Sequence, residues 1–83
     1  MVCNNIEVKI KAGLTSNNLA LFIQKASRYD SEVFVEKGNL RANAKSLLGL
    51  LSLQIANNDK VTLVAKGLDA SKAIKDLGEY LRS

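Results

Sequence analysis

Lys45-Ser-Leu-Leu-Gly-Leu-Leu-Ser-Leu53 places five leucines, at positions 47, 48, 50, 51 and 53, directly behind a serine. Residues spaced three and four apart share one face of a helix, so Leu47, Leu50 and Leu51 can face a core together. Leu48 then points elsewhere. A short helix on a small domain therefore exposes a second apolar face, and such patches often mark partner sites. The pattern alone also allows another interpretation, in which Ser46 only caps the helix and the leucines are core.

The segments on either side of this helix alternate between strands and helices. Before it, Val33 and Val35 alternate with Glu32 and Glu36, and the alternation resumes at Leu40 and Ala42 after a turn centred on Gly38, which predicts a hairpin. After it, turn-forming residues at 57–59 lead to a strand at 61–65. Beyond Gly67, Asp69 is a good N-cap for a last helix. The apolar stripe of that helix consists of Ala70, Ala73, Ile74, Leu77 and Leu81.

The first part of the chain adds one more strand and one more helix. A strand is predicted where apolar residues alternate with charged ones, at Ile6, Val8 and Ile10. Thr15 and Ser16 offer caps for a helix that should end near Tyr29. The apolar positions of that helix are Leu19, Phe22, Ile23 and Ala26. The order βαββαβα favours an α+β fold, with a four-stranded antiparallel sheet and three helices on one face.

Length and composition narrow the class of protein. The 83 residues suffice for a single domain, 1–83, with one modest core. With 47% hydrophobic and 24% charged residues the composition is ordinary for a globular protein, and no apolar run of about 18 residues predicts a membrane span. The start of the chain lacks the features of a secretory leader. The single cysteine, Cys3, fits a reducing compartment, so we expect a cytoplasmic protein.

The residue types that are missing argue against catalysis. The chain has no histidine, and therefore no imidazole base and no histidine metal ligand. Its five glycines stand singly, so no phosphate-binding loop is present. Cys3 has no partner base in evidence. We therefore expect no enzyme activity, no metal and no cofactor.

The net charge of +4 suggests a second hypothesis, a basic face that binds nucleic acid. Its candidate residues are Lys9, Lys11, Lys25, Arg28, Lys37, Arg41 and Lys45. Acidic residues are interleaved with them at Glu7, Asp30, Glu32 and Glu36. A solvated charged sheet face explains the same pattern, so we expect no direct contact with nucleic acid.

Three segments of the chain, 24–30, 43–53 and 61–67, resemble the HPr family, the small phosphocarriers of the bacterial sugar phosphotransferase system. The similarity extends without a gap over essentially the whole chain. Its most specific part is Lys-Ser followed by two apolar residues, Gly, two more apolar residues and Ser-Leu. The resemblance implies an open-faced β-sandwich, in agreement with the order of elements.

The sequence departs from the family at the loop that carries phosphate. Phosphocarriers have Gly, an apolar residue, His, Ala, Arg, Pro and Ala, whereas residues 13–19 are Gly-Leu-Thr-Ser-Asn-Asn-Leu. Thr15 thus occupies the place of the histidine and Asn17 that of the arginine. The relay needs a nucleophilic ring nitrogen and a nearby cation, and a hydroxyl would trap the phosphate as an ester. We therefore expect no phosphocarrier activity; the alternative is a residual or diverged carrier-like protein with another partner.

The sequence retains a second site of the family, the regulatory serine. In family members from low-GC Gram-positive bacteria, the serine matching Ser46 is phosphorylated by HPr kinase/phosphorylase. The product is a corepressor for the LacI-type regulator catabolite control protein A. Residues 32–37 and 44–46 are similar to the catabolite-repression subgroup, which keeps this serine and lacks the histidine. The resemblance implies a regulatory phosphoprotein of carbon catabolite repression that is phosphorylated on Ser46. It also implies that Asn17, in place of the family arginine, weakens or redirects the binding of the corepressor to its partner. The implied partner-binding patch consists of Lys45, Leu47, Leu48 and Leu51.

Overall fold

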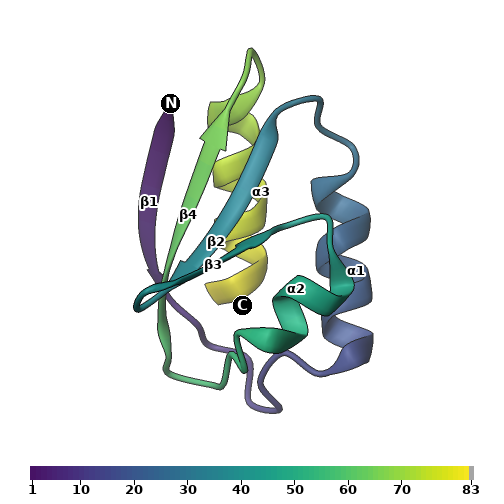
Figure 1. Cartoon of the computed structure of the whole chain (residues 1–83), viewed down its shortest axis with the longest axis vertical. Coiled ribbons are helices and arrows are strands. Elements are labelled where there is room, and N and C mark those ends of the chain that lie inside the picture. The colour runs from purple at the N-terminus through teal and green to yellow at the C-terminus, as the bar shows by residue number, and fades with distance from the viewer. Residues whose placement is uncertain (83) are drawn as a thin grey trace.

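Three helices cover one face of a four-stranded antiparallel sheet in a computed structural model that describes residues 1–82 (Figure 1). The elements are β1 (Val2–Glu7), α1 (Ser16–Ala26), β2 (Glu32–Lys37), β3 (Leu40–Asn43), α2 (Leu47–Ser52), β4 (Lys60–Lys66) and α3 (Ala70–Arg82). This order and this fold class confirm the expectation from the sequence pattern.

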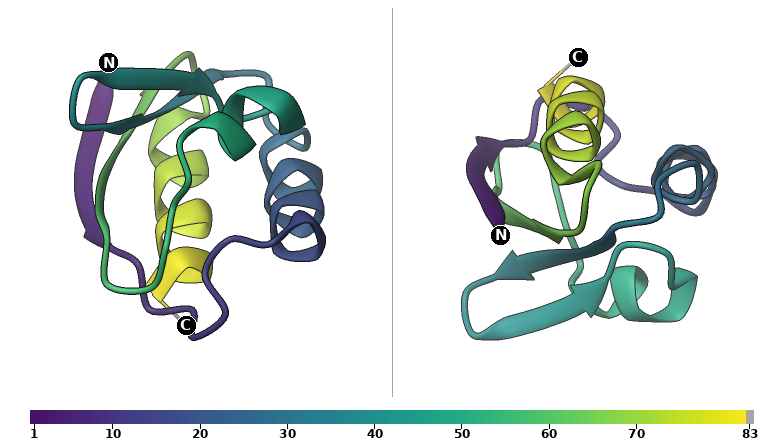
Figure 2. Two further views of the ribbon diagram at one scale, coloured as in Figure 1. Left: turned by 60° about the horizontal axis from the view of Figure 1, so that its bottom comes forward. Right: turned by 90° about the horizontal axis from the view of Figure 1, so that it is seen from above.

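The strands lie in the order β1-β4-β2-β3, and every neighbouring pair is antiparallel. β4 is central and pairs Ala65 with Val33 of β2 and Val61 with Ile6 of β1. β1 and β3 therefore form the two edges of the sheet. The β2–β3 hairpin turns through Gly38 and leads directly into α2, so α2 lies near the β3 edge (Figure 2).

The hydrophobic core lies between the sheet and the helices. The strands contribute every second side chain, such as Val33, Val35 and Leu63, all essentially inaccessible to solvent. Phe22 of α1 packs into this layer with 1% of its surface exposed. The predicted stripe of α3 is confirmed, since Ala70, Ala73, Ile74, Leu77 and Leu81 are all buried.

Two predicted boundaries near the N-terminus were wrong. β1 begins at Val2 and ends at Glu7, whereas the alternation predicted a strand around Ile6 to Ile10. The ladder ends there because Glu7 pairs with Lys60, the first residue of β4. Val8 is still fully buried and exchanges backbone hydrogen bonds with Asn58 and Asp59 in the turn before β4. Likewise, α1 ends at Ala26, three residues before the predicted end at Tyr29.

The expected cap of α3 has a different role. Asp69 directly precedes the helix, but its carboxylate accepts hydrogen bonds from the backbone amides of Asp30 and Ser31, at 3.0 Å each, and from the Ser31 hydroxyl. The Ser31 hydroxyl bond is the main cause that holds the pKa of Asp69 below its usual value of 3.8. Asp69 therefore fastens the α1–β2 loop to the start of α3.

Candidate functional site

Ser46 is the N-cap of α2. Its extended backbone, with φ −112° and ψ 112°, precedes the first helical residue, and its Oγ accepts a hydrogen bond from the Gly49 amide at 3.2 Å. Serine is among the preferred N-cap residues because its oxygen satisfies an amide that has no partner inside the helix. The side chain is half-buried. The capping role of Ser46 is therefore confirmed, and phosphorylation of this half-buried residue stays a prediction.

Lys45, immediately before Ser46, is exposed and reaches across to the α1–β2 loop. Its Nζ donates a hydrogen bond of 2.8 Å to the carbonyl oxygen of Tyr29. The Tyr29 hydroxyl in turn donates to Asp76 of α3 at 2.8 Å. The ammonium group is thus bonded to the α1–β2 loop at the protein surface, and this bond links the segment that carries Ser46 to that loop.

The leucines of α2 divide into a buried and an exposed set. Leu50 and the C-cap residue Leu53 are buried, whereas the exposed fractions are 41% for Leu47, 79% for Leu48 and 38% for Leu51. The helical periodicity correctly predicted that Leu50 faces the core and that Leu48 does not. It also placed Leu47 and Leu51 on the core face, and this part was wrong because both are exposed. Because α2 has only six residues and lies at the edge of the sheet, Leu50 is its one buried residue. Leu47, Leu48 and Leu51 together form an exposed surface that we call the α2 patch.

Three further leucines, Leu21, Leu40 and Leu68, are exposed and were not predicted to be so. Leu21 of α1 and Leu40 of β3 have exposed fractions of 52% and 57%. Leu40 follows the alternation that buries Ala42, so the pattern assigned it to the core. The strand extends past the helical layer at this end, so the side chain has nothing to pack against. No feature of the local sequence distinguishes such a position.

Thr15, in the place of the family histidine, caps α1. It is exposed, and its Oγ1 accepts a hydrogen bond from the Asn18 amide at 3.3 Å. The Asn18 side chain donates to the Gly13 carbonyl at 2.9 Å and so closes the loop below the cap. Asn17 is exposed. The expected capping role of Thr15 is confirmed, and its hydroxyl already accepts a bond from its own helix.

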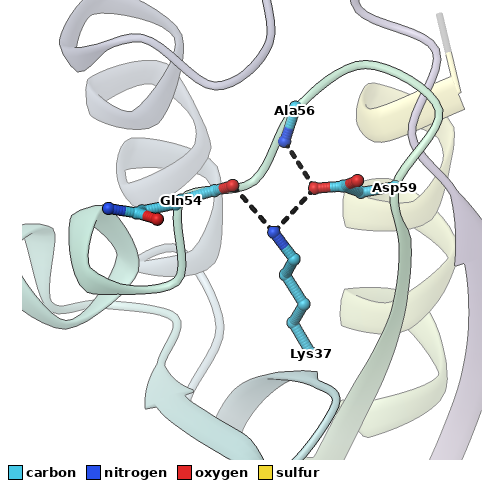
Figure 3. A network of polar contacts seen from close by, with 4 residues as sticks. All are labelled: Lys37, Gln54, Ala56 and Asp59. Carbon is cyan, nitrogen blue, oxygen red and sulfur yellow. Dashed lines mark hydrogen bonds and ion pairs between the residues drawn. The ribbon is translucent and has the colours of Figure 1, made fainter.

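A lysine holds the far end of α2 in place. In Figure 3 the Lys37 ammonium, at the end of β2, points between the carbonyl oxygen of Gln54 and the carboxylate of Asp59, at 2.8 Å from each. Asp59 also accepts a 2.8 Å hydrogen bond from the Ala56 amide. Gln54 follows the C-cap residue of α2, Leu53, and has a positive φ of 51°, an uncommon conformation for a residue with a side chain. The Lys37 contacts therefore fasten the chain just after the α2 patch to the sheet.

We expect this network to make the protein less stable in acid. Lys37 first, and then the Ala56 amide, lower the pKa of Asp59 below its usual 3.8. A lowered folded-state pKa gives a contribution to the free energy of unfolding that is complete above about pH 5 and is lost as the pH falls through the folded-state pKa. Urea unfolding at a series of pH values should show this slope in the native protein. It should be shallower in both Asp59→Asn and Lys37→Met; an unchanged slope in both variants contradicts the assignment.

Several basic residues are paired with carboxylates. Four of the seven residues proposed as a basic face, Lys9, Lys25, Lys37 and Arg41, form ion pairs with Glu7, Asp76, Asp59 and Glu36. Arg41 also lies over the ring of Phe34, with its guanidinium carbon 4.2 Å from the ring centroid. These four cations are therefore neutralised locally, and the absence of a nucleic-acid partner stays a prediction.

Residues 1–82 carry neither a metal-binding cluster nor a membrane-spanning helix. Within this part of the chain no cluster of three or more histidine, cysteine, aspartate or glutamate side chains is arranged to hold a metal ion. None of its helices is both long and apolar enough to cross a membrane. The candidate site consists of Ser46, Lys45 and the α2 patch, which lie together at α2.

Comparison with known proteins places these features in a family. A family model described as "PTS HPr component phosphorylation site" matches residues 2–83. The HPr-like protein Crh of Bacillus subtilis is 43% identical over 82 residues, which are 99% of this chain and 96% of Crh. A crystal structure of Crh from B. subtilis matches at a TM-score of 0.79 and 43% identity, covering 98% of this chain and 93% of Crh. In that structure Crh, a catabolite repression protein, is a swapped dimer. The phosphocarrier HPr of Bacillus anthracis matches at a TM-score of 0.95 and 36% identity, over 98% of this chain and 96% of that one.

Proposed function

The chain belongs to the HPr family of phosphocarriers and regulators, and from this membership we propose that it is a regulatory member. HPr kinase phosphorylates it on Ser46 in the cytoplasm, and the product binds a LacI-type transcription regulator, such as catabolite control protein A, in carbon catabolite repression. The single observation that carries the proposal is the similarity of the whole chain to Crh, a catabolite repression protein. The occupation of the histidine position by Thr15 supports a role without phosphate relay.

The geometry of α2 supports a change of surface rather than a change of fold. Phosphorylation adds about −1.5 to −2 charges and three acceptor oxygens to Ser46. The bridging Oγ keeps a lone pair for the Gly49 amide, so the cap need not be lost. The phosphate would lie at the end of the α2 patch, where an arginine or lysine of a partner can bind it while apolar residues cover the leucines.

The sequence around α2, which has no acidic residue at positions 37–58, also suits this mechanism. Between Glu36 and Asp59 the only charged residues are Lys37, Arg41 and Lys45, all of them basic. The phosphate would therefore be the first negative charge in this stretch, and its addition reverses the sign of the charge next to Ser46. A partner that recognises an anion beside leucines can then distinguish the two forms sharply.

Titration calorimetry of the purified regulator with the two forms of the protein tests the proposal. We expect the phosphorylated form to bind at least about tenfold more tightly, because a phosphate pairs with a cationic side chain through strong charge-assisted hydrogen bonds. The unphosphorylated form is the matched control, since it differs by one group only. Equal affinities for the two forms would exclude a corepressor role for this protein.

A further inference from the structure

The segment that leads from β3 into α2 has a hydrogen-bond partner for each of three consecutive amides. The Ala44 amide donates to the Val33 carbonyl at 2.8 Å, and the Ser46 amide donates to the Asn43 carbonyl at 3.0 Å. Between them, the Lys45 amide donates to Asn43 Oδ1 at 2.8 Å. The first two bonds use backbone acceptors, so any residue at position 43 can form them. Only the third depends on a side chain.

Asn43 thus closes an Asx-turn immediately before Ser46. In such a turn the side-chain oxygen of Asn or Asp accepts a hydrogen bond from the amide two residues later and imitates a backbone turn. The turn determines the direction in which the chain leaves β3, and Ser46 is the next residue. Lys45 supports the same segment from outside through its bond to the Tyr29 carbonyl, which is an exposed contact.

Resting on the function proposed above, we propose that Asn43 is a positioning residue for the phosphorylation of Ser46. It acts through the Lys45 amide and needs no contact with the kinase. A kinase must align the serine hydroxyl with the phosphate that it transfers, and an ordered substrate segment avoids the entropy cost of fixing it in the complex. Loss of the Asn43 acceptor leaves the segment less ordered before binding, so the cost appears mainly as a higher KM.

Steady-state phosphorylation by HPr kinase and ATP tests this with an isosteric pair of variants. Asn43→Leu removes the acceptor and should raise KM by about tenfold or more with a smaller change in kcat. Asn43→Asp keeps an oxygen in the same place and should restore a KM close to that of the native protein. Asn39→Leu, at the exposed turn of the same hairpin, is the control and should leave KM unchanged.

Amide hydrogen exchange gives a readout that does not involve the kinase. The Lys45 amide should exchange faster in Asn43→Leu than in the native protein or in Asn43→Asp, while amides of the central strand β4 keep their protection. A native KM for Asn43→Leu overturns the proposal, as does a raised KM with unchanged exchange at Lys45. If the native protein gains no phosphate at all, the proposed function fails, and the positioning role fails with it.

Discussion

Replacing Leu48 by aspartate is expected to lower the affinity of the phosphorylated protein for the LacI-type regulator by about a hundredfold or more. Leu48 is the most exposed side chain of the α2 patch, at 79%, and lies two residues after Ser46. If the patch forms the apolar centre of the interface, the substitution removes its most accessible contact and buries an unpaired carboxylate in its place. The new charge also repels the phosphate on Ser46. Titration calorimetry measures the loss directly.

The fold supplies a matched control for this experiment. Leu68 is fully exposed in the turn between β4 and α3, which lies at the opposite end of the molecule from α2 (Figure 1). Leu68→Asp makes the same chemical change outside the proposed interface and should leave the affinity unchanged. Since neither leucine packs in the core, both variants should unfold at nearly the native urea concentration. Native affinity in Leu48→Asp would show that the α2 patch is not part of the interface.

Substituting Gly67 by alanine is expected to lower the free energy of unfolding by about 3 kcal/mol. Gly67 has a φ of +148°, a conformation that residues with a side chain rarely adopt. A Cβ there would lie 2.8 Å from Ser31 Cα and 2.9 Å from Ser31 Cβ. Ser31 cannot easily retreat, because it is 2% exposed and its amide and hydroxyl both bind Asp69. Backbone strain and steric overlap with Ser31 therefore both contribute to the expected loss of stability.

The matching substitution at Gly38 distinguishes backbone strain from steric overlap. Gly38 also has a positive φ, of +59°, but a Cβ at this hairpin turn would meet no atom within 4 Å. Gly38→Ala therefore incurs backbone strain without overlap and should lower the free energy of unfolding by only about 1 kcal/mol. Urea unfolding followed by circular dichroism compares the two variants. Equal losses would mean that the contact with Ser31 does not limit position 67.

The architecture could be predicted from the sequence because each element carries a clear period. The burial of Val33 and Val35 on one face of β2 and the apolar stripe of α3 both appear as predicted. Boundaries were less certain where tertiary pairing decides them. β1 ends at Glu7 because β4 begins at Lys60, which is 53 positions away in the sequence and contributes no local signal at Ile10.

The site was only partly predictable for a related physical reason. Ser46 as a cap and Leu48 as an exposed residue follow from local rules, but the exposure of Leu47 and Leu51 depends on where a short helix lies on the sheet. The contact of Lys37 with Asp59 joins segments 22 residues apart and leaves no local pattern. Asn43 did leave a local signal, since an asparagine just before the start of a helix is typical of an Asx-turn to the backbone amide two residues later.

The mass of the intact protein after incubation with HPr kinase and ATP tests most directly whether Ser46 is the switch. We predict that the native protein gains one phosphate and that Ser46→Ala gains none. Ser52→Ala is the control, because Ser52 lies on the same helix with its hydroxyl bonded to the Leu48 carbonyl at 2.9 Å, and it should gain one phosphate like the native protein. An unchanged native mass, or a phosphate that persists in Ser46→Ala, would contradict the account.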